Sequence, residues 1–229
     1  MIHIKSERPD NKIPGLDQEA NDELRRLALI ERCNQYRQNL QGRDPQELAY
    51  MAAISIRRDP GGGLSFSGEH LLETYQISWP GFTITDSKGN PSTLKIEALW
   101  LHYLDRADGF PLAGRWVNLS EIGGLFYQQA FQGYCGDELA ESWGDDLEGL
   151  KQSCLDNGGW AVSGLADLAY EWRVLPRLPL CLCYRLPAGT KKAWATMLFD
   201  ASSGHYVAAD VAAIVGKNLA DQLKPKQSG

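Results

Sequence analysis

Two strand-like runs stand close together in the last third of the chain: LAYEWRVL at residues 168–175 and PLCLCYRL at residues 179–186. Both are rich in the apolar and aromatic residues that are typical of strands. The second run is apolar at almost every position, as in a strand that is covered on both faces. We therefore predict two strands here, with the second in the middle of a sheet.

Other segments on both sides of this pair have the same strand-like composition. They are residues 64–66, 73–79, 82–85, 194–199 and the short extended segment 115–119. Residues 57–63 precede the first of them and contain three consecutive glycines, so we predict a loop there. This loop lacks the Gly-Lys-Ser/Thr ending of a phosphate-binding loop, which excludes that role.

Apolar residues that recur every three or four positions predict the helices. The predicted ranges are 17–40, 45–53, 92–106, 120–131, 137–155 and 210–223, with Asp44, Ser92 and Ser120 as N-caps of the second, third and fourth. Helices and strands together indicate an α+β fold. We expect a mixed, largely antiparallel sheet with packed helices and a helical N-terminal segment.

The chain has 229 residues, of which 43% are hydrophobic. We predict an N-terminal arm over residues 1–18 and a single domain over residues 19–223, with a frayed tail over residues 224–229. No stretch approaches the roughly 20 apolar residues of a membrane-spanning helix, and the N-terminus lacks the apolar segment of a signal peptide. A cytoplasmic protein that is not bound to a membrane is therefore expected.

The net charge of −6 comes from one segment. Residues 131–170 contain eight acidic residues and one base, Lys151, so they carry −7 and leave the rest of the chain close to neutral. An acidic surface repels a phosphate backbone, which argues against nucleic acid as a partner. The 131–170 segment is either a solvated helix face or a docking surface for a protein partner.

The cysteines and histidines do not have the spacing of a metal site. Cys181 and Cys183 lie two residues apart on a predicted strand, so both side chains point to one face. They are either core residues or weak candidates for binding a thiophilic metal. We predict no other metal ligands, and no cofactor is identifiable. His205 is the histidine best placed for a function, because its loop also holds Asp200 and Tyr206.

Several ordered motifs resemble an uncharacterised prokaryotic family, domain of unknown function 3786. The motifs are LWLHYL at residues 99–104, GFPL at 109–112, WVNLSEIGGLFY at 116–127, VLPRLPL at 174–180, LFD at 198–200 and HYV at 205–207. The resemblance covers roughly residues 20–223. It implies an accessory role in anaerobic corrinoid or iron–sulfur metabolism, but no activity.

Two departures from that family limit what the resemblance implies. This chain has no cysteine-rich module for an iron–sulfur cluster, so a cluster would have to come from a partner. The turn at residues 187–192 is basic, with Lys191 and Lys192, where relatives are expected to be acidic. A cation site at this turn is therefore not expected.

Seven side chains near chain breaks are candidates for ligand binding, because binding residues gather in such places. They are Arg115, Trp116, Glu121, Tyr127, Arg177, Asp200 and His205. An arginine and a tryptophan together suit a flat anionic ligand, through bidentate hydrogen bonds and stacking. The same side chains could equally be buried tethers between helices and sheet.

Three functions agree with these observations. The first is a non-catalytic accessory or ligand-binding protein. The second is an enzyme that uses Glu121, Asp200 or His205 for acid–base chemistry. The third is a structural protein-interaction module that uses the acidic segment. Convergent titratable groups in a cleft would favour the enzyme, whereas an apolar, tryptophan-lined cleft with one arginine would favour ligand binding.

Overall fold

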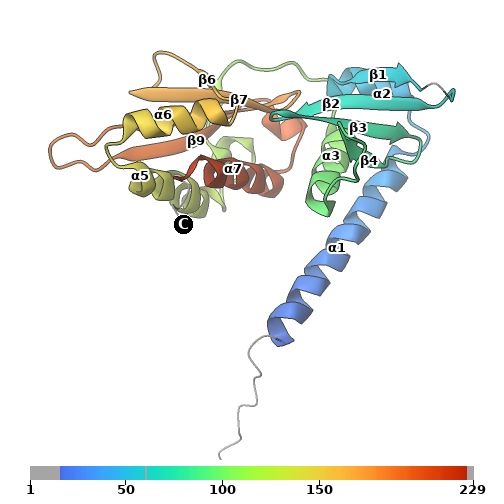
Figure 1. The fold of residues 1–229 in the computed structure, drawn as a ribbon, viewed down its shortest axis with the longest axis horizontal. Helices are drawn as coiled ribbons and strands as arrows, with labels where there is room; N and C mark the ends of the chain where they lie inside the picture. Colours follow the sequence, from blue (N-terminus) through green and yellow to red (C-terminus); the bar gives the residue numbers. More distant parts are fainter. Residues whose placement is uncertain (1–15, 60, 226–229) are drawn as a thin grey trace, which may run out of the picture.

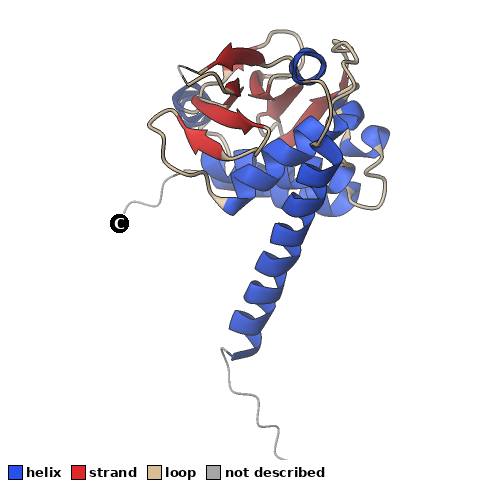
Figure 2. Ribbon diagram, turned by 90° about the vertical axis from the view of Figure 1, so that its right-hand side faces the viewer, coloured by secondary structure: helices blue, strands red, loops and turns tan. Residues whose placement is uncertain are grey.

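The computed structural model describes residues 16–59 and 61–225 and shows an α+β fold, as predicted. The strands form two antiparallel sheets, one with four strands and one with five. Figures 1 and 2 show both sheets on one side of the molecule and most helices packed beneath them. The prediction of a largely antiparallel sheet is confirmed, although it is divided between two sheets.

The first sheet has the strand order β1-β2-β3-β4. These strands are β1 (Ser55–Arg58), β2 (Leu64–His70), β3 (Glu73–Trp79) and β4 (Ile84–Asp86). The predicted loop at residues 57–63 was wrong at its start, because Arg57 and Arg58 belong to β1. They pair with Ser65 and Leu64 of β2. A partner strand completes the backbone hydrogen bonds of this polar segment, which has no strand pattern of its own.

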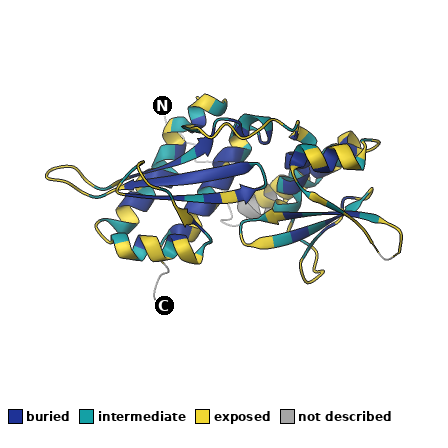
Figure 3. Cartoon of the chain, turned by 90° about the horizontal axis from the view of Figure 1, so that it is seen from above, coloured by how far each residue is buried: buried dark blue, intermediate teal, exposed yellow. Residues whose placement is uncertain are grey.

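The second sheet has the order β5-β9-β8-β7-β6. Its strands are β5 (Trp116–Val117), β6 (Trp160–Ala161), β7 (Leu168–Leu175), β8 (Leu178–Arg185) and β9 (Trp194–Asp200). The central position predicted for residues 179–186 is confirmed, since β8 lies in the middle of this sheet. Figure 3 shows how strongly burial is concentrated in its strands. The two-residue β6 was not predicted, because it is too short to show a pattern.

The longer helices agree with the sequence pattern. They are α1 (Leu16–Leu40), α2 (Pro45–Ala52), α3 (Leu94–Arg106) and α7 (Ala209–Leu223). Asp44 caps α2 as predicted, because its Oδ1 accepts the backbone N–H groups of Gln46 and Glu47, both at 2.9 Å. Thr93, rather than the predicted Ser92, caps α3.

Glycines interrupt the two middle helices. The predicted helix 120–131 is a 3₁₀ turn over Leu119–Ile122, a non-helical stretch, and a short α4 (Gln128–Phe131). Gly123 stands between them with φ of 99°, a conformation that ends a helix. A π-helical turn (Gln132–Asp137) follows α4.

The predicted acidic helix 137–155 is also divided. It consists of α5 (Glu138–Trp143) and α6 (Leu147–Asp156), separated at Gly144, whose φ is 55°. The Tyr184 hydroxyl donates a hydrogen bond of 2.7 Å to the Gly144 carbonyl, so a strand of the second sheet stabilises the break. The acidic residues therefore lie on α5, on α6 and in the turns next to them rather than on one helix.

The helices and both sheets share one continuous core. Within the described part of the chain, this core includes Phe66 and Ile77 of the first sheet and Leu180 and Phe199 of the second. It supports the prediction of a single domain over residues 19–223, which stays a prediction. Most of the predicted N-terminal arm (1–18) lies outside the described residues, as do tail residues 226–229; α1 begins at Leu16.

Helix α1 packs on α3 only through its second half. Cys33 and Leu40 are fully buried there, and Arg37 forms an ion pair with Glu97 of α3 at 2.5 Å. The first half of α1 extends away from the body (Figure 2). Among the described residues, no helix combines the length and the apolar character that crossing a bilayer requires.

Candidate functional site

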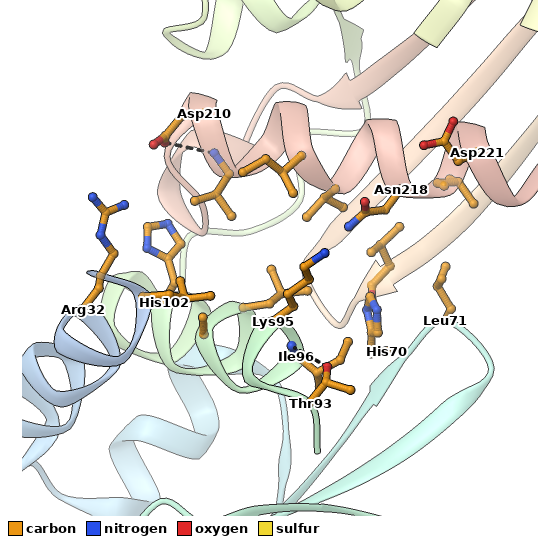
Figure 4. Close-up of a pocket in the computed structure, with 18 of the residues that line it drawn as sticks. Arg32, His70, Leu71, Thr93, Lys95, Ile96, His102, Asp210, Asn218 and Asp221 are labelled. Carbon is orange, nitrogen blue, oxygen red and sulfur yellow. Dashed lines mark hydrogen bonds between the residues drawn. The ribbon is translucent and has the colours of Figure 1, made fainter. Parts of the chain in front are cut away.

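A groove with a volume of about 540 Å³ lies between α3 and α7, and α1 closes one end of it. Figure 4 shows side chains from both helices pointing into it. This volume is in the range of small-molecule sites. The groove walls are mostly apolar. The apolar side chains are Leu29, Leu71, Ile96, Ala98, Leu99, Val174, Val211, Ile214, Val215 and Leu219.

His102 lies at the α1 end of the groove and is 7% exposed. Its Nε2 accepts the backbone N–H of Ala208 at 3.0 Å, so Nε2 has no proton. Nδ1 therefore carries the proton of the neutral ring and donates a hydrogen bond to the Tyr36 hydroxyl oxygen at 2.8 Å. Burial, with the positive charges of Arg106 and Arg32, lowers the pKa of His102 to about 4. Both ring nitrogens are thus occupied.

His70 of β2 points into the groove from the sheet side (Figure 4). Its Nδ1 lies 2.9 Å from the Val174 carbonyl oxygen, which can only accept, so Nδ1 is the donor. Burial lowers the pKa of His70, which favours the neutral ring. The two groove histidines therefore hold the surrounding backbone and are not a pair of acid–base groups.

Lys95 of α3 and Asn218 of α7 point toward one another across the groove (Figure 4). Lys95 forms no ion pair within residues 16–59 and 61–225, nor does Arg32 at the opposite end. Asp221 also lines the groove, but it forms ion pairs with Lys217 and Lys224. The groove thus combines apolar walls with two cations, Lys95 and Arg32, that no ion pair with another described residue neutralises.

None of the seven predicted binding residues lines this groove. Most of them instead contact residues 107–122, which lead from α3 through β5 to the 3₁₀ turn. Two of the seven, Arg177 and His205, meet at Phe110. The Arg177 guanidinium donates to the Phe110 carbonyl at 3.1 Å, and the His205 ring stacks on the Phe110 ring with centroids 3.9 Å apart.

His205 also forms an ion-pair contact on this surface. Its Nδ1 lies 2.6 Å from Oδ2 of Asp108, and both side chains are partly exposed. Burial acts to raise the pKa of Asp108, but the hydrogen bonds from His205 and from the Phe110 amide outweigh it, so the pKa is lowered. This arrangement orients one imidazole and leaves its Nε2 without a partner among the described residues.

Asp200 is a buried tether. It is 3% exposed, and its carboxylate accepts the amides of Ala113, Gly114 and Ser202 at 2.7–2.9 Å. The Ser202 hydroxyl donates a further hydrogen bond at 2.5 Å. Burial acts to raise the pKa of Asp200, but these hydrogen bonds outweigh it and the pKa is lowered. The oxygens are saturated, so Asp200 holds the 107–115 segment and not a ligand.

The remaining four candidates do not form a site together. Arg115 and Glu121 form an exposed ion pair at 3.2 Å, and Glu121 also accepts the Asn118 amide at the start of the 3₁₀ turn. Trp116 is half-buried and packs on the cysteine pair of β8. Tyr127 is exposed, and no hydrogen bond joins its side chain to another described residue.

Cys181 and Cys183 lie on one face of β8, as the strand spacing predicts, and both are buried. They pack with Ala169 against Trp116, Val162, Ala166 and Leu198. The Cys181 thiol donates a hydrogen bond to the Leu182 carbonyl at 3.7 Å. The neighbouring Cys183 thiol and burial both raise the pKa of Cys181. This environment is that of core residues.

The described residues do not provide the ligands of an iron–sulfur cluster. Such clusters are held by several cysteine thiolates. In residues 16–59 and 61–225, no three His, Cys, Asp or Glu side chains gather closely enough to hold a metal ion. The acidic segment also shows no such group, although Asp137, Glu141 and Asp145 border a second hollow of about 560 Å³ together with Lys192.

A family model described as "Domain of unknown function (DUF3786)" matches residues 44–222. The chain belongs to this family. The predicted resemblance is thereby confirmed, although the match begins at Asp44 and leaves α1 outside the DUF3786 domain. Comparison with curated proteins gives no match, and comparison with solved structures gives none either.

The DUF3786 domain provides most of the groove, and α1 adds Leu29, Arg32 and Tyr36 at one end. Sequence reasoning missed this site because its residues come from β2, α3, β7 and α7, which are far apart in the chain. One signal was present: His102 stands in the apolar run LWLHYL, where a histidine must be buried and bonded.

Proposed function

We propose that this DUF3786 protein is a non-catalytic ligand-binding protein, and that its site is the groove between α3 and α7. The groove binds an elongated molecule with an apolar body. The observation that carries this proposal is the combination of apolar walls with two histidines that form internal hydrogen bonds, His102 through both ring nitrogens and His70 through Nδ1. An apolar cleft without convergent acid–base groups favours binding over catalysis.

The proposal is tested by filling the groove with a larger side chain. Ala98 of α3 lines it with a small side chain, so Ala98→Phe places an aromatic ring in the space that a ligand would occupy. The neutral fluorescent probe N-phenyl-1-naphthylamine is expected to bind the wild type with micromolar affinity, and Ala98→Phe is expected to weaken binding at least tenfold. Fluorescence titration measures both affinities.

The matched control is Ala188→Phe, at an exposed turn residue outside the groove. It is expected to leave probe binding within twofold of the wild type. Equal affinities for the wild type and Ala98→Phe would contradict the proposal, provided that circular dichroism shows both proteins folded.

A second candidate function is acid–base catalysis at His205. The Asp108–His205 contact of 2.6 Å favours it, because the carboxylate orients the imidazole and leaves Nε2 available as a base. Asp200 is not part of this candidate, since its oxygens are saturated. A screen for hydrolysis of activated esters tests it: activity that His205→Gln abolishes would support the enzyme, and no activity would count against it.

The narrower role implied by the family resemblance is support of anaerobic corrinoid or iron–sulfur metabolism. The family membership is its only support. Titration of the protein with cobalamin, followed by absorbance, tests the corrinoid form, and a saturable spectral shift is the expected result. An iron–sulfur cluster would have to be held by a partner, since the described residues do not supply its ligands.

Docking of a protein on the acidic segment 131–170 also remains a proposal. Its charge supports it, because eight acids against one base would attract a basic surface. The same charge supports the prediction that nucleic acid is not a partner. Cytoplasmic location likewise remains a prediction.

A further inference from the structure

Lys95 and Asn218 are two polar residues that face one another across the groove (Figure 4). The Lys95 ammonium lies on α3, and the Asn218 amide lies opposite it on α7. Asn218 is exposed, and no hydrogen bond joins its side chain to another residue of 16–59 or 61–225. Both groups can therefore donate hydrogen bonds to an added molecule.

The nearby carboxylates do not neutralise Lys95. Asp221 is occupied by Lys217 and Lys224, and Glu97 of α3 pairs with Arg37 of α1. Asp210 stands at the other end of the groove, near His102 and Arg32 (Figure 4). Glu73 lies near His70 and accepts the Tyr75 hydroxyl. Lys95 forms no ion pair with any described residue, so this end of the groove offers one ammonium next to apolar space.

We infer that the groove takes an amphipathic anion, with its anionic head between Lys95 and Asn218 and its apolar chain along Ile96, Leu99 and Val215. This inference rests on the proposed function and adds the chemical class of the ligand. A carboxylate accepts hydrogen bonds from an ammonium and an amide at once, and charge-assisted hydrogen bonds are the stronger kind. A volume of about 540 Å³ suits a small amphiphile.

The position of the head group follows from the histidine. His70 Nδ1 donates to the Val174 carbonyl, so the remaining Nε2 is an acceptor. His70 therefore offers the head group no hydrogen-bond donor, and the donors at this end of the groove are Lys95 and Asn218. The chain then runs toward the α1 end, between the apolar faces of α3 and α7.

Decanoate and decanol distinguish charge from apolar burial, because they differ only in the head group. Each competes with bound N-phenyl-1-naphthylamine in a fluorescence assay. Decanoate is expected to bind the wild type about tenfold more tightly than decanol. Lys95→Met removes the charge but keeps an apolar stem, and it should weaken decanoate binding about tenfold while decanol binding stays within twofold.

Asn218→Asp is the sharper variant, because it keeps the shape of the side chain. The new carboxylate pairs with Lys95 and repels an anion, so decanoate binding should fall at least tenfold and decanol binding should not change. Lys191→Met, at an exposed lysine outside the groove, is the matched control and should change neither affinity.

The outcomes separate this inference from the proposed function. One outcome is that decanol binds as tightly as decanoate and that neither Lys95→Met nor Asn218→Asp changes the affinity for decanoate. The groove then binds apolar molecules, and the inference of an anionic head group is wrong. If Arg32→Met, rather than Lys95→Met, weakened decanoate binding tenfold, the head group would lie at the Arg32 end and its placement beside Lys95 would be wrong. If neither amphiphile displaces the probe, and Ala98→Phe does not affect the probe, the proposed function fails as well.

Discussion

The free energy of unfolding is expected to fall by about 2 kcal/mol between pH 7 and pH 5 because of His102 alone. The neutral ring accepts the Ala208 amide and donates to Tyr36, so a second proton would break the bond to Ala208. Protonation is therefore unfavourable in the folded state, where burial lowers the pKa to about 4.

The sign follows from proton binding. An unfolded histidine titrates near pH 6.5, so between about pH 6.5 and pH 4 the unfolded chain binds a proton that the folded chain does not. The contribution of His102 to stability is fully present above about pH 6.5 and is lost as the pH falls toward 4. His70 contributes in the same direction, because its pKa is also lowered by burial.

Urea unfolding at pH 7, 6 and 5 measures this loss, and His102→Gln identifies its source. The glutamine amide can accept from Ala208 and donate to Tyr36, but it does not titrate in this range. The variant should lose about 2 kcal/mol less than the wild type on going from pH 7 to pH 5. An unchanged pH dependence in His102→Gln would show that the pKa of His102 is the same in the folded and the unfolded protein, which would contradict the prediction.

Asp200→Ala is expected to lower the free energy of unfolding by about 3 kcal/mol at pH 7. The substitution removes the acceptor of three backbone amides and one hydroxyl, and it leaves buried donors without partners. Asp200→Asn should cost about 2 kcal/mol, because an amide nitrogen replaces one of the two oxygens that accept these bonds.

The matched control for Asp200 is Asp167→Asn. Asp167 is exposed, and it accepts one backbone amide, that of Leu186, at 2.9 Å. Its substitution should cost less than about 0.5 kcal/mol in the same urea experiment. Equal losses in Asp200→Asn and Asp167→Asn would mean that the anchoring of residues 113–114 contributes little to stability.

The sequence predicted the elements that have a strong local pattern. The strands around β8, the helix α3 and the cap at Asp44 follow from apolar runs, helical periodicity and a side chain that can accept backbone amides. Elements without such a pattern were missed or misplaced. β1 needs β2 to complete its hydrogen bonds, and Gly123 and Gly144 end helices that periodicity alone would continue.

The binding candidates show the same limit. Choosing polar side chains near chain breaks led to Arg177 and His205, which do come together at Phe110. The same reasoning chose Asp200, which is a buried structural acceptor. It did not reach Lys95 or Asn218, because a single lysine or asparagine on an amphipathic helix has no local feature that marks it as part of a site.

The sequence by itself determined the α+β class and the central strand, because these depend on composition and on periodicity between neighbours in the chain, and the resemblance of its ordered motifs identified the family. Only the tertiary structure decided where the groove lies and which charges in it stay unpaired. Those properties depend on how α3, α7 and the second half of α1 pack, and on which carboxylates Lys217, Lys224 and Arg37 neutralise. The packing contacts, such as those of Arg37 with Glu97 and of His102 with Ala208, join residues 60 or more positions apart, and no local pattern encodes them.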